Sequence, residues 1–391
     1  MYLVDGRRYE PDGQGLESAL AAAHDDRIRP LCLCRDPAIP VYITRLGGTF
    51  ALKRMPFTGS QHAVGCTHYE PPVELSGLGE VLGTAISEDP DTGVTQLRVG
   101  FSMSKGAPRA VDAGAGQDSG SVRSDGTRLS LRGLLHFLWR EAELTKWRPA
   151  FDGKRSWAVV RSHLLAAASN KVLKGLSLSD ALYVPEAFTV ANAEAIRIRR
   201  ERRFAQGLRR NGQTHSKMIL IGELKEIVPT RCHFNVVIKH VPDAPFLLST
   251  DLYRRTKRHF ENELAFWAGS AETRLIMAAT FALADWGQPM IDELCLVPTS
   301  AQWLPVDDGF EKQLIDRLVS EHRAFDKSLG FNWKLPSSSI SAVLMDGARA
   351  PVALALDRLL DTGMDSEAVA RPASTTWRWC VYATEIPTLP R

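Results

Sequence analysis

Short apolar runs separated by turns fill the first hundred residues of the chain. Residues 16–23 carry apolar side chains at helical spacing and predict one helix in this part. Residues 41–44 and 50–53 are strand-like runs on either side of Gly47-Gly48, a pattern typical of a β-hairpin. We therefore expect a small, mainly β module at the N-terminus.

Helical spacing dominates residues 128–190. One helix is predicted by leucines that recur every three or four positions: Leu131, Leu134, Leu135 and Leu138. Tryptophans and basic residues are interspersed through this block, which fits either a winged-helix-like module or a plain helical core. Residues 193–210 continue as a very basic helix that Asn211-Gly212 closes.

From residue 218 the pattern changes to strands. Strands are predicted at residues 218–227, 234–240, 275–284 and 291–298, with a helix at 251–267. The last segment predicts a helix at 310–325, strands at 340–345 and 351–356, and a closing Trp377-Arg378-Trp379.

A chain of 391 residues is longer than one ordinary hydrophobic core covers. The fold class that these patterns predict is α+β and multi-domain. Residues 105–127 are rich in Gly, Ala, Ser and Asp and have little to bury, so they indicate a linker. The predicted units are a zinc-binding β-hairpin module (1–100), a flexible linker (101–127), a helical domain with the basic helix (128–216), a mixed α/β domain (217–300) and a C-terminal α/β domain (301–391).

Composition narrows the class of protein. Hydrophobic residues make up 44% and charged residues 24%, which is the balance of a folded globular chain. The start of the chain meets charge too early for a signal peptide, and the apolar run at 275–284 is about half of a membrane span. Six cysteines are sparse, and Cys232, Cys295 and Cys380 are expected to be buried singly. We expect a cytoplasmic protein without a membrane segment.

A group of cysteines and histidines carries the clearest chemistry. Cys32 and Cys34 stand one residue apart, and Cys66 follows with His62 before it and His68 after it. Zinc prefers four soft or borderline ligands in a tetrahedron, and a hairpin between the two pairs would bring them together. The predicted ligands are Cys32, Cys34 and Cys66 with either His62 or His68. Three thiolates leave no open position, so we expect the zinc to be structural.

Several motifs extend over nearly the whole chain: Arg29-Pro30-Leu31-Cys32-Leu33-Cys34, Leu52-Lys53-Arg54-Met55-Pro56, Gly59-Ser60-Gln61-His62 with Cys66, Glu70-Pro71-Pro72 with Leu78-Gly79, Gly222-Glu223-Leu224-Lys225-Glu226 and Lys239-His240-Val241-Pro242-Asp243. Together they resemble a bacterial family of unknown function, the domain-of-unknown-function family eleven-seventy-three. The resemblance implies a cytoplasmic protein carried by integrative and conjugative elements, close to transferred DNA. It favours His62 over His68 as the fourth ligand and implies no activity.

The basic helix is the candidate nucleic-acid interface. At 100° per residue, one side of the predicted helix gathers Arg199, Arg202, Arg203 and Arg210. Clustered arginines of this kind neutralise phosphates. A second basic cluster lies on the next predicted helix: Arg254, Arg255, Lys257 and Arg258. The alternative is a solvated helix that pairs with acidic groups of this protein or of a partner.

Glu223 and Lys225 are the weak catalytic candidates. They follow an apolar strand with one residue between them, as in the second half of a metal-dependent nuclease motif. On a regular strand both would point to one face, where they could simply pair with each other. An acid from elsewhere, such as Asp243 or Asp251, would have to complete a magnesium site.

The C-terminal segment predicts a fold similar to a metal-dependent nuclease whose site has been lost. Its helix carries Glu311, but the strand positions that would hold acids are Ser341 and Ala355. Asp346 falls in a turn and Asp357 beyond a strand. Without two convergent carboxylates such a site does not hold Mg²⁺ in the usual way.

These observations favour an accessory protein of a mobile element that binds DNA or RNA through its basic helix and does not catalyse a reaction. One alternative is a metal-dependent nuclease that uses Glu223 and Lys225. The other is an adaptor whose zinc module and tryptophan-rich helices bind proteins encoded by the same element.

Overall fold

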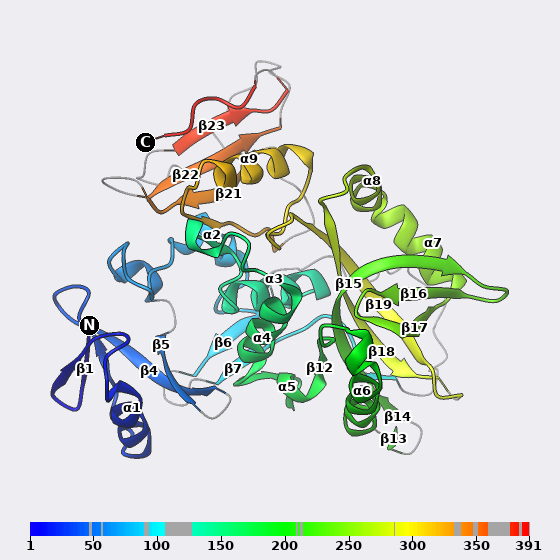
Figure 1. Ribbon diagram of the computed structural model, residues 1–391, viewed down its shortest axis with the longest axis horizontal. Coiled ribbons are helices and arrows are strands. Elements are labelled where there is room, and N and C mark those ends of the chain that lie inside the picture. Colours follow the sequence, from blue (N-terminus) through cyan, green and yellow to red (C-terminus); the bar gives the residue numbers. More distant parts are fainter. Residues whose placement is uncertain are drawn as a thin grey trace.

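The computed structural model describes residues 1–46, 49–55, 58–89, 94–105, 127–208, 210–211, 214–284, 286–331, 338–346, 351–358, 376–382 and 385–390. Gly47-Gly48 and most of the predicted linker lie outside these residues. Figure 1 shows an N-terminal sheet, a central layer of helices, a barrel beside it and a C-terminal sheet above. The chain is therefore α+β, as predicted. Within the described part of the chain, no helix is both long and apolar enough to cross a bilayer.

The N-terminal sheet has the strand order β2-β1-β3-β4-β5. Its strands are β1 (Tyr2–Val4), β2 (Arg7–Tyr9), β3 (Leu31–Cys32), β4 (Ile39–Leu46) and β5 (Thr49–Arg54). Helix α1 (Leu16–Asp25) buries Leu20 and Ala23 against Val4 and Val41, which explains its apolar spacing. Both the predicted helix and the predicted hairpin β4–β5 are confirmed.

Two helices form the centre: α3 (Leu131–Glu141) and α4 (Trp157–Ala168). Ser130 and Ser156 cap them by accepting hydrogen bonds from backbone N–H groups. Beside them runs a sheet of β6 (Ile86–Glu88), β7 (Thr95–Leu97), β10 (Lys171–Leu173) and β11 (Leu176–Ser177). Because β7 pairs with β10 and β6 pairs with β7, part of the first hundred residues is built into the centre of the molecule.

Five strands close into a barrel: β15 (Met218–Pro229), β16 (Phe234–Ile238), β17 (Val241–Leu248), β18 (Arg274–Leu283) and β19 (Pro289–Thr299). The order around it is β15-β16-β17-β19-β18, and β18 pairs back with β15. Neighbours are antiparallel except β17 and β19. Gly222 allows the Ile238 side chain to approach β15 closely, since a Cβ there would lie 2.8 Å from it.

Two elements of the barrel differ from their sequence pattern. Strand β17 was not predicted, because Pro242 and Pro245 lack the backbone N–H that a paired strand donates. The prolines are tolerated because β17 has only one register pair with β19, so not every backbone N–H of β17 has to donate to a neighbouring strand. The helix predicted at 251–267 is two helices, α7 (Thr250–His259) and α8 (Glu261–Gly269), that meet at the buried Phe260.

The C-terminal sheet has the order β23-β22-β21-β20-β9, and helix α9 (Gly309–Ser320) lies against it. Its strands are β9 (Lys146–Trp147), β20 (Phe325–Lys327), β21 (Ser338–Leu344), β22 (Val352–Asp357) and β23 (Thr376–Cys380). Only β22 and β23 are parallel among these pairs. Helix α9 ends five residues before the predicted Phe325, which belongs to a strand.

The remaining elements join these bodies, and all but the helix α6 (Ala193–Gly207) are short: η1 (Gly59–Gln61), α2 (Val73–Ser76), η2 (Leu78–Glu80), β8 (Ser104–Lys105), η3 (Pro149–Phe151), α5 (Leu178–Ala181), β12 (Leu182–Tyr183), η4 (Val190–Asn192), β13 (Arg210–Asn211) and β14 (Thr214–Ser216). The predicted basic helix is α6, which ends before Arg210.

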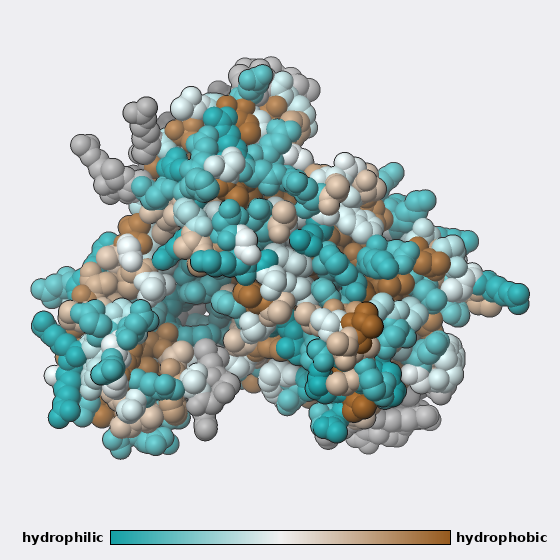
Figure 2. Space-filling view, viewed as in Figure 1, coloured by the Kyte–Doolittle hydropathy of each residue, from teal (hydrophilic) through white to brown (hydrophobic). Residues whose placement is uncertain are grey.

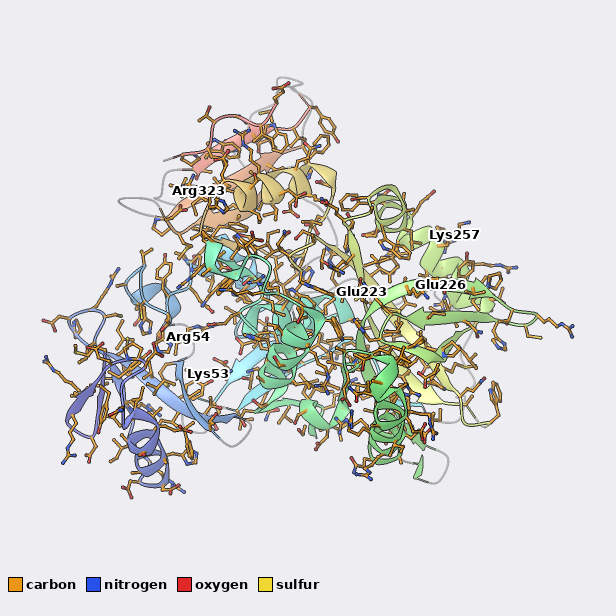
Figure 3. All side chains as sticks on the ribbon, viewed as in Figure 1. Lys53, Arg54, Glu223, Glu226, Lys257 and Arg323 are labelled. Atoms are coloured by element: carbon orange, nitrogen blue, oxygen red, sulfur yellow. The ribbon has the colours of Figure 1, made fainter. Side chains whose placement is uncertain are left out.

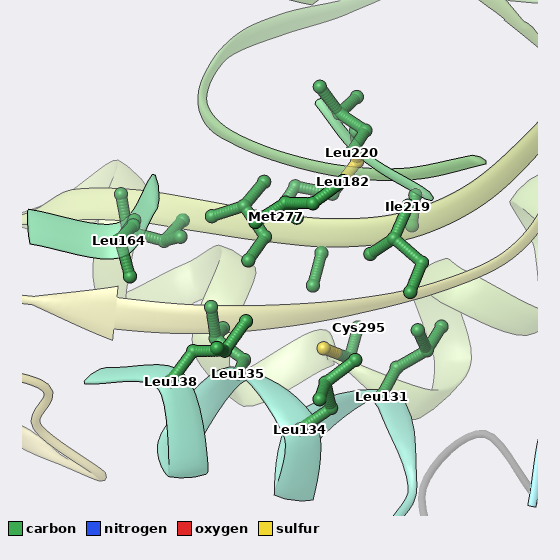
Figure 4. Packing of buried hydrophobic residues seen from close by; sticks show 14 of the residues in the cluster. Leu131, Leu134, Leu135, Leu138, Leu164, Leu182, Ile219, Leu220, Met277 and Cys295 are labelled. Atoms are coloured by element: carbon green, nitrogen blue, oxygen red, sulfur yellow. The ribbon is translucent and has the colours of Figure 1, made fainter. Parts of the chain in front are cut away.

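One large core spans the central helices and the barrel. Leucines of α3 pack toward Met277 and Cys295 of the barrel wall (Figure 4). Cys295 is buried as expected, but Cys232 and Cys380 are exposed. Cys232 lies in the β15–β16 turn and Cys380 ends an edge strand, so neither reaches a core.

Candidate metal centre and candidate nucleic-acid interface

Three short segments bring the cysteines and His62 together. Cys32 is the last residue of β3, and Cys34 follows on the turn after it. The 3-10 helix η1 directs His62 toward them, and a turn in which the Cys66 N–H bonds to the Ala63 carbonyl returns Cys66 to the same point. The hairpin β4–β5 between the pairs closes the long gap in sequence, as predicted.

The spacing of these four side chains fits one metal ion. The sulfurs of Cys32 and Cys66 are 3.6 Å apart, and His62 Nδ1 is 3.3 Å from the Cys34 sulfur and 3.8 Å from that of Cys66. The edge of a tetrahedron with metal–sulfur bonds of about 2.3 Å is roughly 3.8 Å. All four ligand atoms lie within 4.8 Å of one another. The Cys32, Cys34, His62 and Cys66 cluster could therefore hold a metal ion.

His68 lies beside this cluster and has a different partner. Its Nε2 is 3.0 Å from the Tyr2 hydroxyl, and its ring centroid is 5.4 Å from that of His62. Burial lowers the pKa of His68 to about 4, so the ring is neutral at pH 7. The group of ligand atoms that converge contains His62 and not His68.

The predicted arginines of α6 are mostly engaged within the chain. Arg199 makes two hydrogen bonds to Glu186, at 2.9 and 2.8 Å. Arg203 donates to the backbone carbonyls of Ser179 and Leu182. Arg202 is exposed, and no described residue is its partner. The side chain of Arg210 lies outside the described residues.

Helix α7 presents the second basic cluster to solvent. Its four cations are exposed, and within the described ranges none of them has a hydrogen bond or ion pair: Arg254, Arg255, Lys257 and Arg258. Its other face packs on the barrel, where the Tyr253 ring stacks on Phe234 at 3.7 Å. Figure 3 shows Lys257 on this outer side of the barrel.

Two turns of the barrel lie near the start of α7. Phe234 pairs with Leu248, so the β15–β16 turn with exposed Arg231 is next to the end of β17. Leu247 pairs with Met290, which places the β18–β19 turn there too. That turn carries Trp286, which is 63% exposed. Trp286 was not predicted as a site residue, although an aromatic residue in a turn between apolar strands was a usable signal.

The weak catalytic candidates are not brought together. Glu223 is buried and accepts hydrogen bonds from Lys239 at 2.9 Å and Arg274 at 3.2 Å. Lys225 is exposed and faces Glu226 instead, because a β-bulge between Leu224 and Glu226 breaks the alternation. Figure 3 shows Glu223 inside the molecule and Glu226 farther out along β15.

The proposed completing acids are also engaged elsewhere. Asp243 is bound by both terminal nitrogens of Arg200, at 2.9 and 2.6 Å, and Asp251 is exposed at the start of α7. Among the described residues, the one group of histidine, cysteine and acidic side chains that converges is the N-terminal cluster.

Asp326 of β20 is one buried acid of the C-terminal sheet, and helix α9 adds a second, Glu311. Lys327 Nζ lies 2.9 Å from it, and the Ser341 hydroxyl donates to the same oxygen. Asp346 pairs with Arg323 in the turn, and Asp357 lies 3.4 Å from Arg378. Glu311 is therefore bonded to an ammonium group and a hydroxyl, and among the described residues it is not part of a group that could hold a metal ion.

Comparison with known families identifies the chain. The model of the family described as "Protein of unknown function (DUF1173)" matches residues 2–382, and the chain belongs to that family. No curated protein matches the sequence.

Proposed function

We propose that this member of the DUF1173 family binds single-stranded nucleic acid on the outer face of its barrel and does not catalyse a reaction there. The proposal rests on four exposed cations of α7 that have no hydrogen bond or ion pair with the described residues. Phosphates supply most of the affinity of such surfaces, because bound cations release counterions from the nucleic acid.

The barrel supports this proposal. Its strand order, with β17 parallel to β19 and a helix before β18, is that of the OB-fold. Barrels of that kind bind single strands between their turns, where aromatic side chains stack on bases. Trp286 and Arg231 occupy such turns here. Because fold alone does not set function, the exposed side chains carry the proposal.

Helix α7 is a better interface than α6 on energetic grounds. A phosphate that binds Arg199 would have to replace two charge-assisted hydrogen bonds to Glu186. The cations of α7 lose only solvent and counterions when a phosphate binds.

Binding of a fluorescent oligothymidine, followed by anisotropy at several salt concentrations, tests the proposal. Replacing Arg254, Arg255, Lys257 and Arg258 with Gln should weaken binding and flatten the log–log salt slope by about 3, since each single-strand contact contributes about 0.7. The matched control replaces Arg199, Arg202 and Arg203 on α6 with Gln and should change the slope little.

Three other outcomes would redirect the assignment. If only the α6 variant loses slope, the interface is the basic helix that the sequence predicted. If the parent binds no nucleic acid at low salt, the adaptor function takes its place. Mg²⁺-dependent cleavage that disappears in Glu223→Ala would establish the nuclease instead.

We further propose that the metal of the N-terminal cluster is zinc and that it is structural. Three thiolates and one imidazole are a closed zinc ligand set, without a free position for a substrate. Such an ion contributes folding free energy to a small module. A cytoplasmic location near the transferred DNA of a mobile element, which the family resemblance implies, is compatible with this function.

A further inference from the structure

The β18–β19 turn presents an indole ring to solvent. Trp286 is 63% exposed, whereas the other described tryptophans are buried or partly buried. The strands on either side of this turn bury apolar side chains in the barrel, among them Phe281 and Ile291. Removing a large aromatic side chain from water is favourable, so a ring left mostly in water is a candidate contact for a partner.

The turn holds this ring in a defined position. Trp286 Nε1 donates a hydrogen bond to Gln288 Oε1, at 3.1 Å. Two backbone bonds of 2.8 Å close the turn, from the Ala284 N–H to the Gln288 carbonyl and from the Gly287 N–H to the Ala284 carbonyl. Because the indole N–H already has an acceptor, the faces of the ring are what Trp286 offers to a ligand. Among the described residues, no aromatic ring or cation stacks on them.

The charge around this turn suits a phosphate backbone. Register pairs of β17 bring the β15–β16 turn, the start of α7 and the β18–β19 turn to the end of that strand. In the sequence of these turns and α7, five cations, Arg231 and the four of α7, outnumber two acids, Asp251 and Asp285. Figure 2 shows hydrophilic side chains over much of the barrel side of the molecule. A ligand with both flat rings and phosphates fits an aromatic face and an excess of cations.

We propose that Trp286 stacks on an unpaired base and thereby selects single strands over duplexes. This inference rests on the proposed function and adds the basis of its selectivity. Both forms of nucleic acid carry phosphates, so the cations of α7 do not distinguish them by the sign of charge. In a duplex the faces of each base are covered by its neighbours, whereas a single strand can turn a base face toward the indole. Stacking of this kind tolerates every base.

Anisotropy with three fluorescent probes of equal length tests this inference: oligothymidine, an abasic strand with the same phosphates, and a duplex. The parent should bind oligothymidine more tightly than the abasic strand. Trp286→Ala should weaken the binding of oligothymidine about tenfold, because one stacking contact is lost. The variant should bind the abasic strand and the duplex as the parent does, and its salt slope should not change, because no charge is removed.

Two variants control this experiment. Trp286→Phe keeps an aromatic ring and should retain most of the affinity. Tyr382→Ala removes an aromatic side chain that is 56% exposed after the C-terminal strand β23, and it should bind as the parent does. Oligothymidine should also quench the tryptophan fluorescence of the parent, and it should quench that of Trp286→Phe much less.

The outcomes separate this inference from the proposed function. Equal binding of oligothymidine by Trp286→Ala and the parent would overturn the inference, as would equal binding of oligothymidine and the abasic strand by the parent; a flatter salt slope in the α7 glutamine variant would still support the proposed function. A parent that binds none of the three probes would overturn both. If Trp286→Ala loses affinity while the α7 variant keeps its salt slope, the inference stands and the cations of α7 are not the interface.

Discussion

The neighbours of a side chain, more than its type, set its role in this protein. His62 and His68 are six residues apart in the sequence, and their rings lie side by side in the N-terminal module. His62 points Nδ1 at the sulfurs of Cys34 and Cys66, whereas His68 bonds to the Tyr2 hydroxyl. One is placed to bind a metal and the other to support the fold.

Metal content should follow this difference. Protein prepared with zinc present should carry about one zinc ion per chain. Cys32→Ser and Cys66→Ser should lose most of it, and His62→Ala should lose more than His68→Ala does. Elemental analysis by mass spectrometry measures the ratio. Equal zinc in the cysteine variants and the parent would contradict the site.

His136 provides a second prediction at this scale. It is fully enclosed, its Nδ1 lies 2.7 Å from the Gly330 carbonyl, and burial, followed by the charge of Arg132, lowers its pKa to about 3. In the unfolded chain the pKa is about 6.5. Between these values the unfolded state binds the extra proton, so the free energy of unfolding falls as the pH is lowered from about 6.5.

His136→Gln removes this titration and keeps a donor for Gly330. Urea unfolding at pH 7, 6 and 5 should show a smaller loss of stability than in the parent, by up to about 1.4 kcal/mol per pH unit. His24→Gln changes an exposed histidine and serves as the control. Parallel pH profiles for His136→Gln and the parent would refute the assignment.

Among the elements, helices α6 and α7 show that equal charge in sequence does not give equal charge at the surface. Both are arginine-rich, but α6 lies near Glu186 and Asp243, whereas the outer face of α7 meets no described acid. The arginines of α6 therefore contribute to its attachment, Arg200 to β17 of the barrel and Arg199 to Glu186 in the segment before the helix.

The Arg200–Asp243 pair is where that attachment can be measured. Arg200 is 6% exposed and Asp243 is partly open, so Arg200→Gln should lower the free energy of unfolding by about 1–3 kcal/mol. Arg202→Gln, on the exposed side of the same helix, should change it by less than about 0.5 kcal/mol. Chemical denaturation of both variants gives the comparison, and equal effects would mean that the pair does not hold α6 in place.

At the scale of the whole molecule, close backbone contacts connect segments that are far apart in the chain. Residues after the metal cluster reach the C-terminal sheet: the Leu329 N–H bonds to the Ser76 carbonyl at 3.3 Å, and the Ser328 hydroxyl to the Leu75 carbonyl at 2.6 Å. Gly77 lies at this junction with φ near +80°.

Gly77→Ala should loosen the junction. A Cβ there would overlap the Leu329 carbonyl oxygen, which belongs to the backbone and has little room to move. Gly83 has nearly the same φ with open space around it, so Gly83→Ala isolates the conformational cost of about 1–2 kcal/mol. Thermal unfolding should show Gly77→Ala to be clearly the less stable variant. Equal melting temperatures would show that the contact is not tight.

The sequence by itself determined those features that depend on neighbours along the chain. Apolar residues at helical spacing set α3 and α4, the two strand-like runs set the β4–β5 hairpin, and the cysteine spacing indicated the metal cluster. These are local, because a helical face or a hairpin depends on residues a few positions apart.

Only the tertiary structure decided which segments meet. It closed β15 on β18, added β9 to the C-terminal sheet, included β17 despite its prolines, and gave the α6 arginines their carboxylates. Hydrogen bonds between strands and ion pairs between helices join residues that lie far apart in the sequence. The composition of the chain does not specify which acidic side chain pairs with each basic one. The cations of α7 have no ion pair for the same reason: the packing of distant segments brought no acid to them within the described chain.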